Sequence, residues 1–410
     1  MKKDWNFDEI IDRSNSASMK WEPEVLNRVF GKGKEDLLPL WVADMDFKCP
    51  KPVRMAMENR ISHQIYGYSL NDPSYYSAVI SWHKRRHQWL VAKEWILTTP
   101  GVVPAITYMI QCFTNPGDKV LIQPPVYYPF AQSILNNGRQ IQENPLYIVS
   151  GQYKMDFDDL EAKANDPRVK LAILCSPHNP VGRVWKHDEL ETFGKICIKN
   201  NILIISDEIH CDLIMPGHKH ISFPTLSEEF AQHSVTCIAA SKTFNLAGLQ
   251  QSSIIIPNPT IRARLFTHLE NLGFINGVGS TLFGAIAATA AYNEAEEWLD
   301  DLLIYLHDNF NFLKTKLEQG LSGVKVFDLE GTYLAWVDFR ELGYDNESQI
   351  KLLEETAKVG LDHGNWFGDN GTGFERFNIA CPRAILEKAV ESIIKALRGK
   401  GGESTLESAD

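Results

Sequence analysis

The stretch LAILCSPHNPVGRVWKHDELETFGKICIKNNILIISDEIH, residues 171–210, decides the fold. It contains two short apolar runs, LAILCS and ILIISD, that have the composition of buried strands. Between them an apolar face recurs at helical spacing, through Leu190, Phe193 and Cys197. Asp188 and Glu191, three residues apart, resemble the capping box of a helix N-terminus. A strand, a helix and a strand in this order predict a βαβ unit with two parallel strands.

Similar runs flank this unit and extend the pattern. KVLIQ (119–123), VTCIAAS (235–241) and SSIIIP (252–257) are each short and apolar. We expect all of them to be parallel strands of one sheet with helices between them, which makes this part of the chain α/β. Ligands of open α/β sheets bind beyond the carboxyl ends of the strands, so a functional site is expected in the loops that follow these runs.

The pattern of apolar and polar residues changes after about residue 290. EEWLDDLLIYLHDNFNFLKTKLEQ (296–319) predicts a long amphipathic helix, and GVKVFDLEGTYLAWVDFR (323–340) alternates as antiparallel strands do. A chain of 410 residues is also long enough for two domains. We therefore predict an N-terminal arm that joins the small domain (1–48), a large domain (49–290), a small α+β domain (291–398) and a disordered tail (399–410).

Composition narrows the class of partner. The formal net charge of -11 disfavours nucleic acid, because phosphate binding needs a basic surface. The sequence has neither a signal peptide nor an apolar run long enough to span a bilayer, so we expect a cytoplasmic protein without membrane contact. The seven cysteines form no CxxC pair and are expected to be reduced, buried thiols.

Polar residues stand at the ends of several expected strands. Asn179 and Asp207 follow two of the runs, and Lys242 follows a third. Taken singly, these residues have ordinary interpretations as a turn former, a helix cap and a loop cation. Because successive parallel strands bring their carboxyl ends to one edge, the three together predict a common site.

Six segments in a fixed order resemble a known family. TPGVVPA, QPPVYYPF, SPHNPVGRVW, SDEIH, SKTFNLAGLQ and GFERFNIACPR look like the fold type I pyridoxal-phosphate enzymes, the class I/II aminotransferase superfamily, over residues 5–398. LPLWVADMDF, YGYS and SKTFNLAGLQ are most similar to the cystathionine β-lyase-like carbon–sulfur lyases. The resemblance implies a large domain with a mostly parallel seven-stranded sheet flanked by helices, and a smaller α+β domain.

The resemblance also implies roles for residues around pyridoxal 5'-phosphate. Lys242 would bind the cofactor covalently and act as the base, and Asp207 would pair with the pyridinium nitrogen. Asn179 would donate to the phenolic oxygen, with His210 on the same edge, and Tyr127 would stack on the ring.

The phosphate group is expected at a helix N-terminus. The backbone amides of Val102 and Val103 and the hydroxyl of Ser241 would bind it. Many aminotransferases of this superfamily have an arginine where this chain has Gln250. The lyase-like subgroup lacks that arginine and resembles this chain at the position. The missing cation leaves a role for a tyrosine from the other subunit, which implies a homodimer with shared active sites. Tyr66 and Tyr68 are the candidates, and the place of Tyr68 in the motif favours it.

Three further residues are expected to contact the amino-acid substrate. Arg376 in GFERFNIA matches the arginine that binds the α-carboxylate through two parallel hydrogen bonds, although a surface arginine is the alternative. Backbone groups around Ala43 would close over the same carboxylate. Tyr128 or Lys242 would guide a proton to the leaving sulfur.

The favoured reaction is α,β-elimination from L-cystathionine or cysteine S-conjugates, which yields a thiol, pyruvate and ammonia. A class I/II aminotransferase remains the alternative, because both reactions begin with removal of the α-proton. A protein of this fold that acts mainly as a regulatory binding partner is an alternative of another class.

HCDLIMPGHKH (210–220) raises the possibility of a zinc site. Its candidate ligands are His210, Cys211, His218 and His220. No second cluster with ligand spacing accompanies them, so we predict no metal and place His218 and His220 on a surface loop.

Overall fold

The computed structural model describes residues 4–274 and 279–398. The helices are α1 (Pro23–Phe30), α2 (Lys51–Ser62), α3 (Pro73–His87), α4 (Val102–Phe113), α5 (Pro129–Leu135), α6 (Phe157–Ala164), α7 (His187–Lys199), α8 (Glu228–Gln232), α9 (Ala240–Thr243), α10 (Pro259–Asn271), α11 (Leu282–Glu294), α12 (Glu296–Gly320), α13 (Asn346–Lys351) and α14 (Arg383–Arg398). The strands are β1 (Leu38–Pro39), β2 (Ile96–Thr99), β3 (Lys119–Ile122), β4 (Gln140–Glu143), β5 (Tyr147–Val149), β6 (Gln152–Lys154), β7 (Val169–Cys175), β8 (Leu203–Asp207), β9 (Ser234–Ile238), β10 (Ser252–Ile255), β11 (Lys325–Val326), β12 (Leu334–Asp338), β13 (Val359–Gly360), β14 (Asp362–His363) and β15 (Phe374–Asn378).

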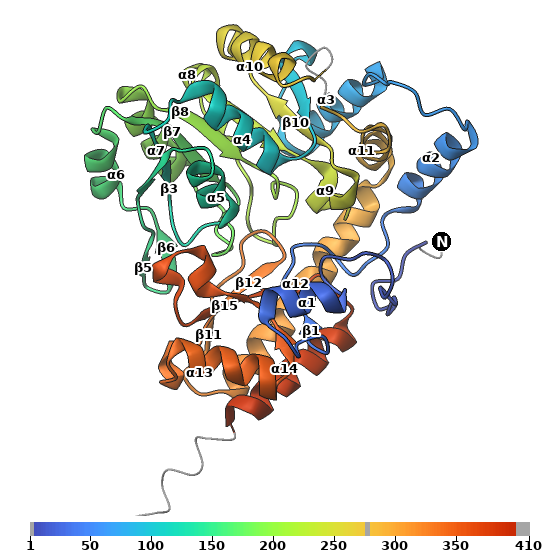
Figure 1. Cartoon of the computed structure of the whole chain (residues 1–410), viewed down its shortest axis with the longest axis vertical. Coiled ribbons are helices and arrows are strands. Elements are labelled where there is room, and N and C mark those ends of the chain that lie inside the picture. Colours follow the sequence, from blue (N-terminus) through green and yellow to red (C-terminus); the bar gives the residue numbers. More distant parts are fainter. Residues whose placement is uncertain (1–3, 275–278, 399–410) are drawn as a thin grey trace, which may run out of the picture.

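A seven-stranded sheet forms the centre of the molecule (Figure 1), with the strand order β2-β10-β9-β8-β7-β3-β4. The strands from β9 to β4 pair in parallel, and the predicted βαβ unit is present as β7, α7 and β8. The prediction of an α/β fold with a mostly parallel sheet is confirmed.

One expected parallel strand runs the other way. β10, the SSIIIP run, is antiparallel to both of its neighbours, β2 and β9. The connection from β9 to β10 contains only the four-residue helix α9 and a single 3-10 turn, Ala247–Leu249. Parallel neighbours are usually joined by a longer helix that covers a face of the sheet, and this connection has none. The chain turns back instead, and it is this connection that carries Lys242.

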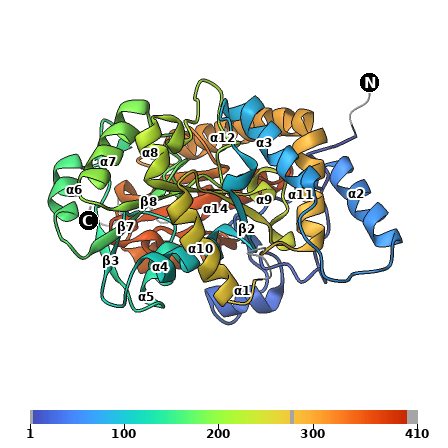
Figure 2. The same cartoon turned by 90° about the horizontal axis from the view of Figure 1, so that it is seen from above.

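Alternate residues of the strands enter different cores because strand side chains point to opposite faces. Ile173 of β7 packs with α4, α5 and α10, whereas Leu174 packs with α6, α7 and α8. Figure 2 shows the two groups of helices on opposite sides of the sheet. Both faces are covered, which explains why the strands read as continuous apolar runs.

The start of helix α7 differs in detail from the expectation. The residue that caps it is Glu189, whose carboxylate accepts the backbone N–H of Lys186 at 2.9 Å. The predicted pair of Asp188 and Glu191 is wrong by two residues, because the helix begins at His187 with Lys186 as its N-cap.

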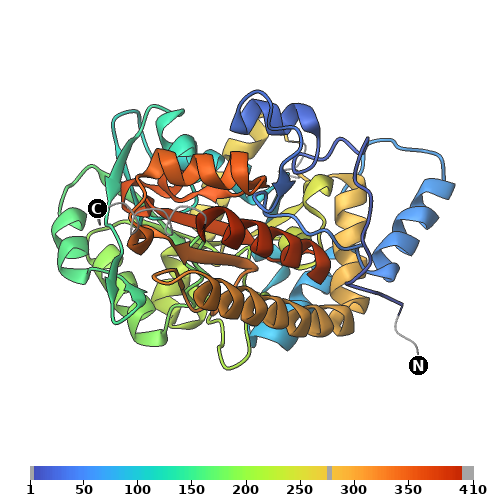
Figure 3. The ribbon, with the colours of Figure 1, turned by 90° about the horizontal axis from the view of Figure 1, so that it is seen from below.

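A second, antiparallel sheet has the order β11-β12-β15-β14. The long helix α12, predicted from its amphipathic pattern, connects the two parts of the chain, and it lies beside α14 under this sheet (Figure 3). β1 pairs with β13, so the N-terminal segment joins this second part. The domain boundaries at 48, 290 and 398 stay predictions, and residues 399–410 lie outside the described residues.

Two further expectations concern composition. All seven cysteines are free, and only Cys49 is more than slightly exposed. In the described part of the chain, no helix combines the length and the apolar character needed to cross a membrane.

Candidate active site

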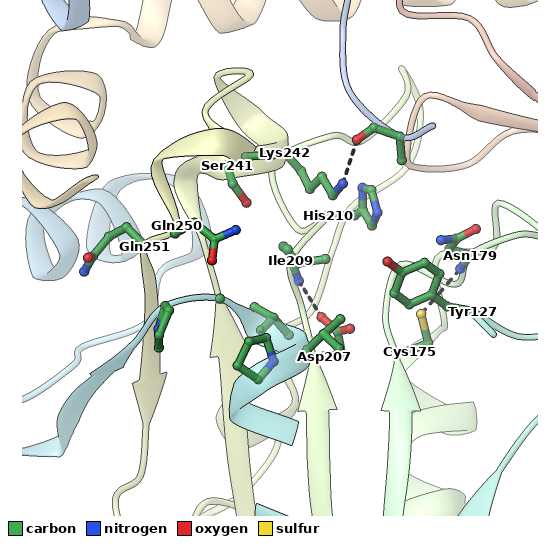
Figure 4. Close-up of a pocket in the computed structure, with 17 residues that line it drawn as sticks. Tyr127, Cys175, Asn179, Asp207, Ile209, His210, Ser241, Lys242, Gln250 and Gln251 are labelled. Carbon is green, nitrogen blue, oxygen red and sulfur yellow. Dashed lines mark hydrogen bonds between the residues drawn. The ribbon is translucent and has the colours of Figure 1, made fainter. Parts of the chain in front are cut away.

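A cavity of about 270 Å³ lies at the carboxyl ends of β7, β8 and β9. It brings together most of the residues that the sequence predicted, which Figure 4 shows pointing into one space. Those that line it are Ala43, Val102, Val103, Tyr127, Asn179, Asp207, His210, Ser241 and Lys242. The prediction that successive strand ends converge on one site is confirmed.

Lys242 extends into this cavity from helix α9. Its Nζ donates a hydrogen bond to the backbone oxygen of Ala43 at 2.6 Å. Burial lowers the pKa of Lys242 to about 8, although the nearby carboxylates of Asp44 and Asp207 act in the opposite direction. About one lysine in ten is then neutral at pH 7, and a neutral amine is both a nucleophile and a base.

The turn that carries Lys242 is fixed by its neighbours in sequence. Thr243 Oγ1 donates to Asp212 Oδ2 at 2.8 Å. Asn245 accepts the N–H of Met45 at 3.0 Å and donates to the oxygens of Met45 and Phe47 at 2.9 and 2.8 Å. These bonds hold the N-terminal segment against the lysine turn and explain why the oxygen of Ala43 meets Nζ.

Asp207 is the last residue of β8 and is buried at the floor of the cavity. Its Oδ1 accepts the backbone N–H of Ile209 at 3.1 Å. Burial raises the pKa of Asp207 to about 7, against the effects of this N–H group and of Lys242. A carboxylate held in this way is stabilised by any further cationic donor that enters the cavity.

Arg376 of β15 is buried and orients Asn179. Arg376 Nη1 donates to Asn179 Oδ1 at 2.9 Å, which leaves the Asn179 amide nitrogen available as a donor. Arg376 Nη2 donates to the oxygen of Trp41 at 3.0 Å and forms an ion pair with Asp362. Since its side chain is only 2% exposed, the alternative of a surface arginine is wrong. No sequence pattern pointed to Asp362.

One wall of the cavity is suited to an anion. Helix α4 begins there at Val102, and no side chain caps its first N–H groups. Ser241, Gln250 and Gln251 line the same cavity. Free N–H groups and the positive end of the helix dipole attract a negatively charged group.

The rings of Tyr127 and His210 complete the lining of the cavity. The ring of Tyr127 stands at the cavity wall, and its backbone N–H donates to the oxygen of Asn179 at 3.1 Å. Burial lowers the pKa of His210 well below its ordinary value, so its imidazole is neutral. Tyr333, which the sequence did not single out, donates from its hydroxyl to the oxygen of Ala43 at 2.8 Å.

Three predicted residues are not part of the cavity lining: Arg376, which reaches it through Asn179, and Tyr128 and Tyr68. Tyr128 is half-buried, and its ring contacts those of Trp366 and Phe367. Tyr68 is fully exposed in this single chain and borders a separate surface hollow beside Phe274 and Leu282. Their predicted roles stay predictions.

The zinc ligands considered for residues 210–220 do not come together as one set. His210 lines the active-site cavity, whereas Cys211, His218 and His220 border a different one. The placement of His220 on a surface loop is wrong, because its Nε2 lies 2.9 Å from Glu208 Oε2 and the pair is buried. The sequence could not show this contact, since twelve residues separate the two side chains.

Comparison with known proteins agrees with this architecture. Cystathionine beta-lyase PatB of Bacillus subtilis is 43% identical over 394 residues, which cover 96% of this chain and all of that protein. A PLP-bound putative aminotransferase from Clostridium difficile 630 superimposes with a TM-score of 0.92 at 43% identity, over 96% of this chain and 100% of the other. The PLP-bound C-S lyase from Staphylococcus hominis superimposes with a TM-score of 0.89 at 35% identity, over 96% and 98%.

The family match covers most of the chain. Residues 35–393 correspond to the family described as aminotransferase class I and II. This range includes both sheets and every predicted site residue. The chain therefore belongs to the class I and II aminotransferase family.

Proposed function

We propose that this protein is a pyridoxal-phosphate-dependent carbon–sulfur β-lyase. It removes a thiol from the β-carbon of L-cystathionine or a cysteine S-conjugate and yields pyruvate and ammonia. The observation that carries the proposal is the buried Lys242 that shares one cavity with Asp207 and an uncapped helix N-terminus. The full-length similarity to the lyase PatB favours elimination within the family.

The side chains present fit pyridoxal phosphate. Burial raises the pKa of Asp207 to about 7 and so disfavours its ionised form. A cationic partner such as a protonated ring nitrogen would stabilise that form. The free amide nitrogen of Asn179 suits a phenolic oxygen, and the N-terminus of α4 with Ser241 suits a phosphate. Lys242 has the lowered basicity that covalent attachment to an aldehyde requires.

When bound, pyridoxal phosphate supplies an electron sink that stabilises negative charge on the α-carbon of the substrate. Lys242 Nζ removes the α-proton. Asp207 remains ionised and so stabilises the positive charge on the ring nitrogen of the cofactor. Arg376 binds the substrate carboxylate, and its bonds to Asn179 and Trp41 keep the guanidinium plane fixed. Lys242 or Tyr128 then delivers a proton to the departing sulfur.

We further propose a homodimer in which Tyr68 of one subunit reaches the phosphate of the other. The complete exposure of Tyr68 in the single chain supports this role, and so do exposed apolar neighbours, Ile61, Ile65, Tyr66 and Leu70. Free cysteines throughout the chain are compatible with a cytoplasmic enzyme that acts on small molecules.

An aminotransferase is the second candidate, favoured by the similarity to the putative aminotransferase from Clostridium difficile 630. The two activities differ in the fate of the amino group. Purified holoenzyme is incubated with L-cystathionine without any keto acid, and pyruvate and free thiol are followed together, with Lys242→Ala as the control. Equal and continuing release of both products supports the lyase. Turnover that requires a keto-acid acceptor would overturn this assignment in favour of the aminotransferase.

A further inference from the structure

A second group of reactive side chains lies behind the lysine turn. His87 at the end of α3 meets Cys211 and Asp212, which follow β8. One ligand atom from each of the three lies within 4.8 Å of the other two. These residues border a cavity of about 510 Å³ that shares no lining residue with the active-site cavity. The cluster therefore lies at a cavity of its own, separate from the active site.

The donor set is that of a borderline transition-metal ion. A thiolate, an imidazole and a carboxylate together suit Zn²⁺, whereas Mg²⁺ and Ca²⁺ prefer oxygen ligands alone. Ligands of one tetrahedral zinc ion lie about 3 to 4 Å apart, given metal–ligand bonds of 2.0 to 2.3 Å. The spacing in this chain lies close to that range, so small side-chain rotations bring the three atoms around one ion.

The orientation of the cluster is already set by hydrogen bonds. His87 Nε2 lies 2.7 Å from Asp212 Oδ1, which also accepts the indole N–H of Trp82 at 3.0 Å. Among the described residues, Asp212 Oδ2 accepts from Thr243 Oγ1 alone. A carboxylate has about four lone-pair positions, so Oδ2 keeps one for a cation.

His220 borders the same cavity but is not among the three residues whose ligand atoms lie within 4.8 Å of one another. The centroid of its ring lies 5.7 Å from that of His87. Its Nε2 is bound to Glu208, which is itself held by Ser206 Oγ and the N–H of Phe223. His220 therefore packs beside the cluster, and the protein ligands are the other three residues.

We propose that His87, Cys211 and Asp212 bind one Zn²⁺ ion, with water in the fourth position. On binding, the S–H bond of Cys211 breaks, the proton leaves to solvent and a bond forms between Sγ and zinc, without any change of oxidation state. The ion joins the end of α3 to the segment after β8. Because zinc binds the folded chain, it raises the temperature of unfolding.

The test uses the holoenzyme after removal of adventitious metal with a chelator. Binding of Zn²⁺ is measured by equilibrium dialysis, and Co²⁺ serves as a spectroscopic probe, since a thiolate ligand gives it an intense charge-transfer band. The variants are Cys211→Ser and His87→Gln, and Cys49→Ser is the matched control because Cys49 lies outside the cluster and its cavity. Neither readout depends on lyase activity.

We expect wild type and Cys49→Ser to bind one ion per chain, to show the thiolate band and to unfold at a higher temperature with zinc. Cys211→Ser and His87→Gln should each weaken binding by at least roughly tenfold and lose the thermal shift. If Cys211→Ser fails to fold, the comparison rests on His87→Gln, because His87 is the last residue of its helix and glutamine keeps a polar side chain there. Binding that survives in the soluble variants, or a cobalt complex without the thiolate band, would refute the site.

Discussion

Replacing Asp207 by asparagine is expected to stabilise the apoprotein while it weakens the enzyme. Burial raises the pKa of Asp207 from 3.8 to about 7, which corresponds to about 4 kcal/mol of cost for holding the charged form in the folded chain. The sign follows from linkage. A carboxyl group with a raised pKa in the folded state lowers stability progressively as pH rises from 3.8 to about 7. Above that pH the full cost is present.

The apoprotein of Asp207→Asn should therefore be more stable than wild type at pH 8, by up to about 4 kcal/mol. At pH 5 the advantage should shrink to below about 2 kcal/mol, because folded wild-type Asp207 is then largely protonated. Urea unfolding of both apoproteins at the two pH values measures the difference. In the holoenzyme the same substitution removes the anion that faces the cofactor, so kcat/KM should fall by about a thousandfold, the equivalent of about 4 kcal/mol.

The neighbouring Glu208 provides the matched control. Despite its burial, contacts with His220 and with the N–H of Phe223 hold the pKa of Glu208 below its ordinary value. Glu208→Gln should consequently lower stability at pH 8, in contrast to Asp207→Asn. If Asp207→Asn instead lowers both the stability of the apoprotein and the activity, Asp207 is an ordinary structural carboxylate and the reasoning fails.

Four further predictions follow from other contacts. Arg376→Lys loses the planar guanidinium that donates to Asn179 and Trp41. In steady-state kinetics, KM for the amino acid should rise by roughly ten- to a hundredfold with a smaller change in kcat. An unchanged KM would contradict the role of Arg376 in binding the carboxylate. Asn245→Ala should destabilise the chain by about 1 to 3 kcal/mol in urea unfolding, because the Met45 N–H and the Phe47 oxygen lose their hydrogen bonds to Asn245. A neutral effect would show that these bonds are dispensable. Despite burial, Glu375 and Glu354 raise the pKa of His363 to about 9, so wild type should lose stability as pH rises from 6.5 through about 9, and His363→Asn should lack this dependence in unfolding measured across that range. Tyr68→Phe should weaken retention of the cofactor. Mixing Tyr68→Phe subunits with Lys242→Ala subunits should restore activity, since one site of each heterodimer then has both Lys242 and the partner's Tyr68. Failure of mixing to restore activity would count against shared sites.

The part of the fold that the sequence predicted is the part governed by local periodicity. The runs of β7 and β8 and the apolar face of α7 are visible in 40 consecutive residues, and the spacing that identified α12 is equally local. The direction of β10 was missed because SSIIIP has the same composition in either orientation. The connection before β10 lacks a crossover helix, and the composition of the strand itself does not show this.

The site residues that were predicted are likewise those that a local sequence pattern marks. Asn179, Asp207 and Lys242 were found because each follows a strand, and parallel strands deliver their ends to one edge. Asp362, Tyr333 and Asp212 were missed, since they act through partners that lie far away in sequence. The contact of His87 with Asp212 spans 125 positions, so no local pattern could have placed a histidine of α3 beside Cys211.

The nitrogen balance of the reaction tests the central claim most directly. Ammonia, pyruvate and thiol are quantified together while the holoenzyme consumes a large molar excess of L-cystathionine in a solution free of keto acids. The account predicts equal amounts of the three products over many turnovers, and none from Lys242→Ala. Turnover that stops after one equivalent per active site, with the amino group retained by the enzyme and no ammonia released, would contradict it.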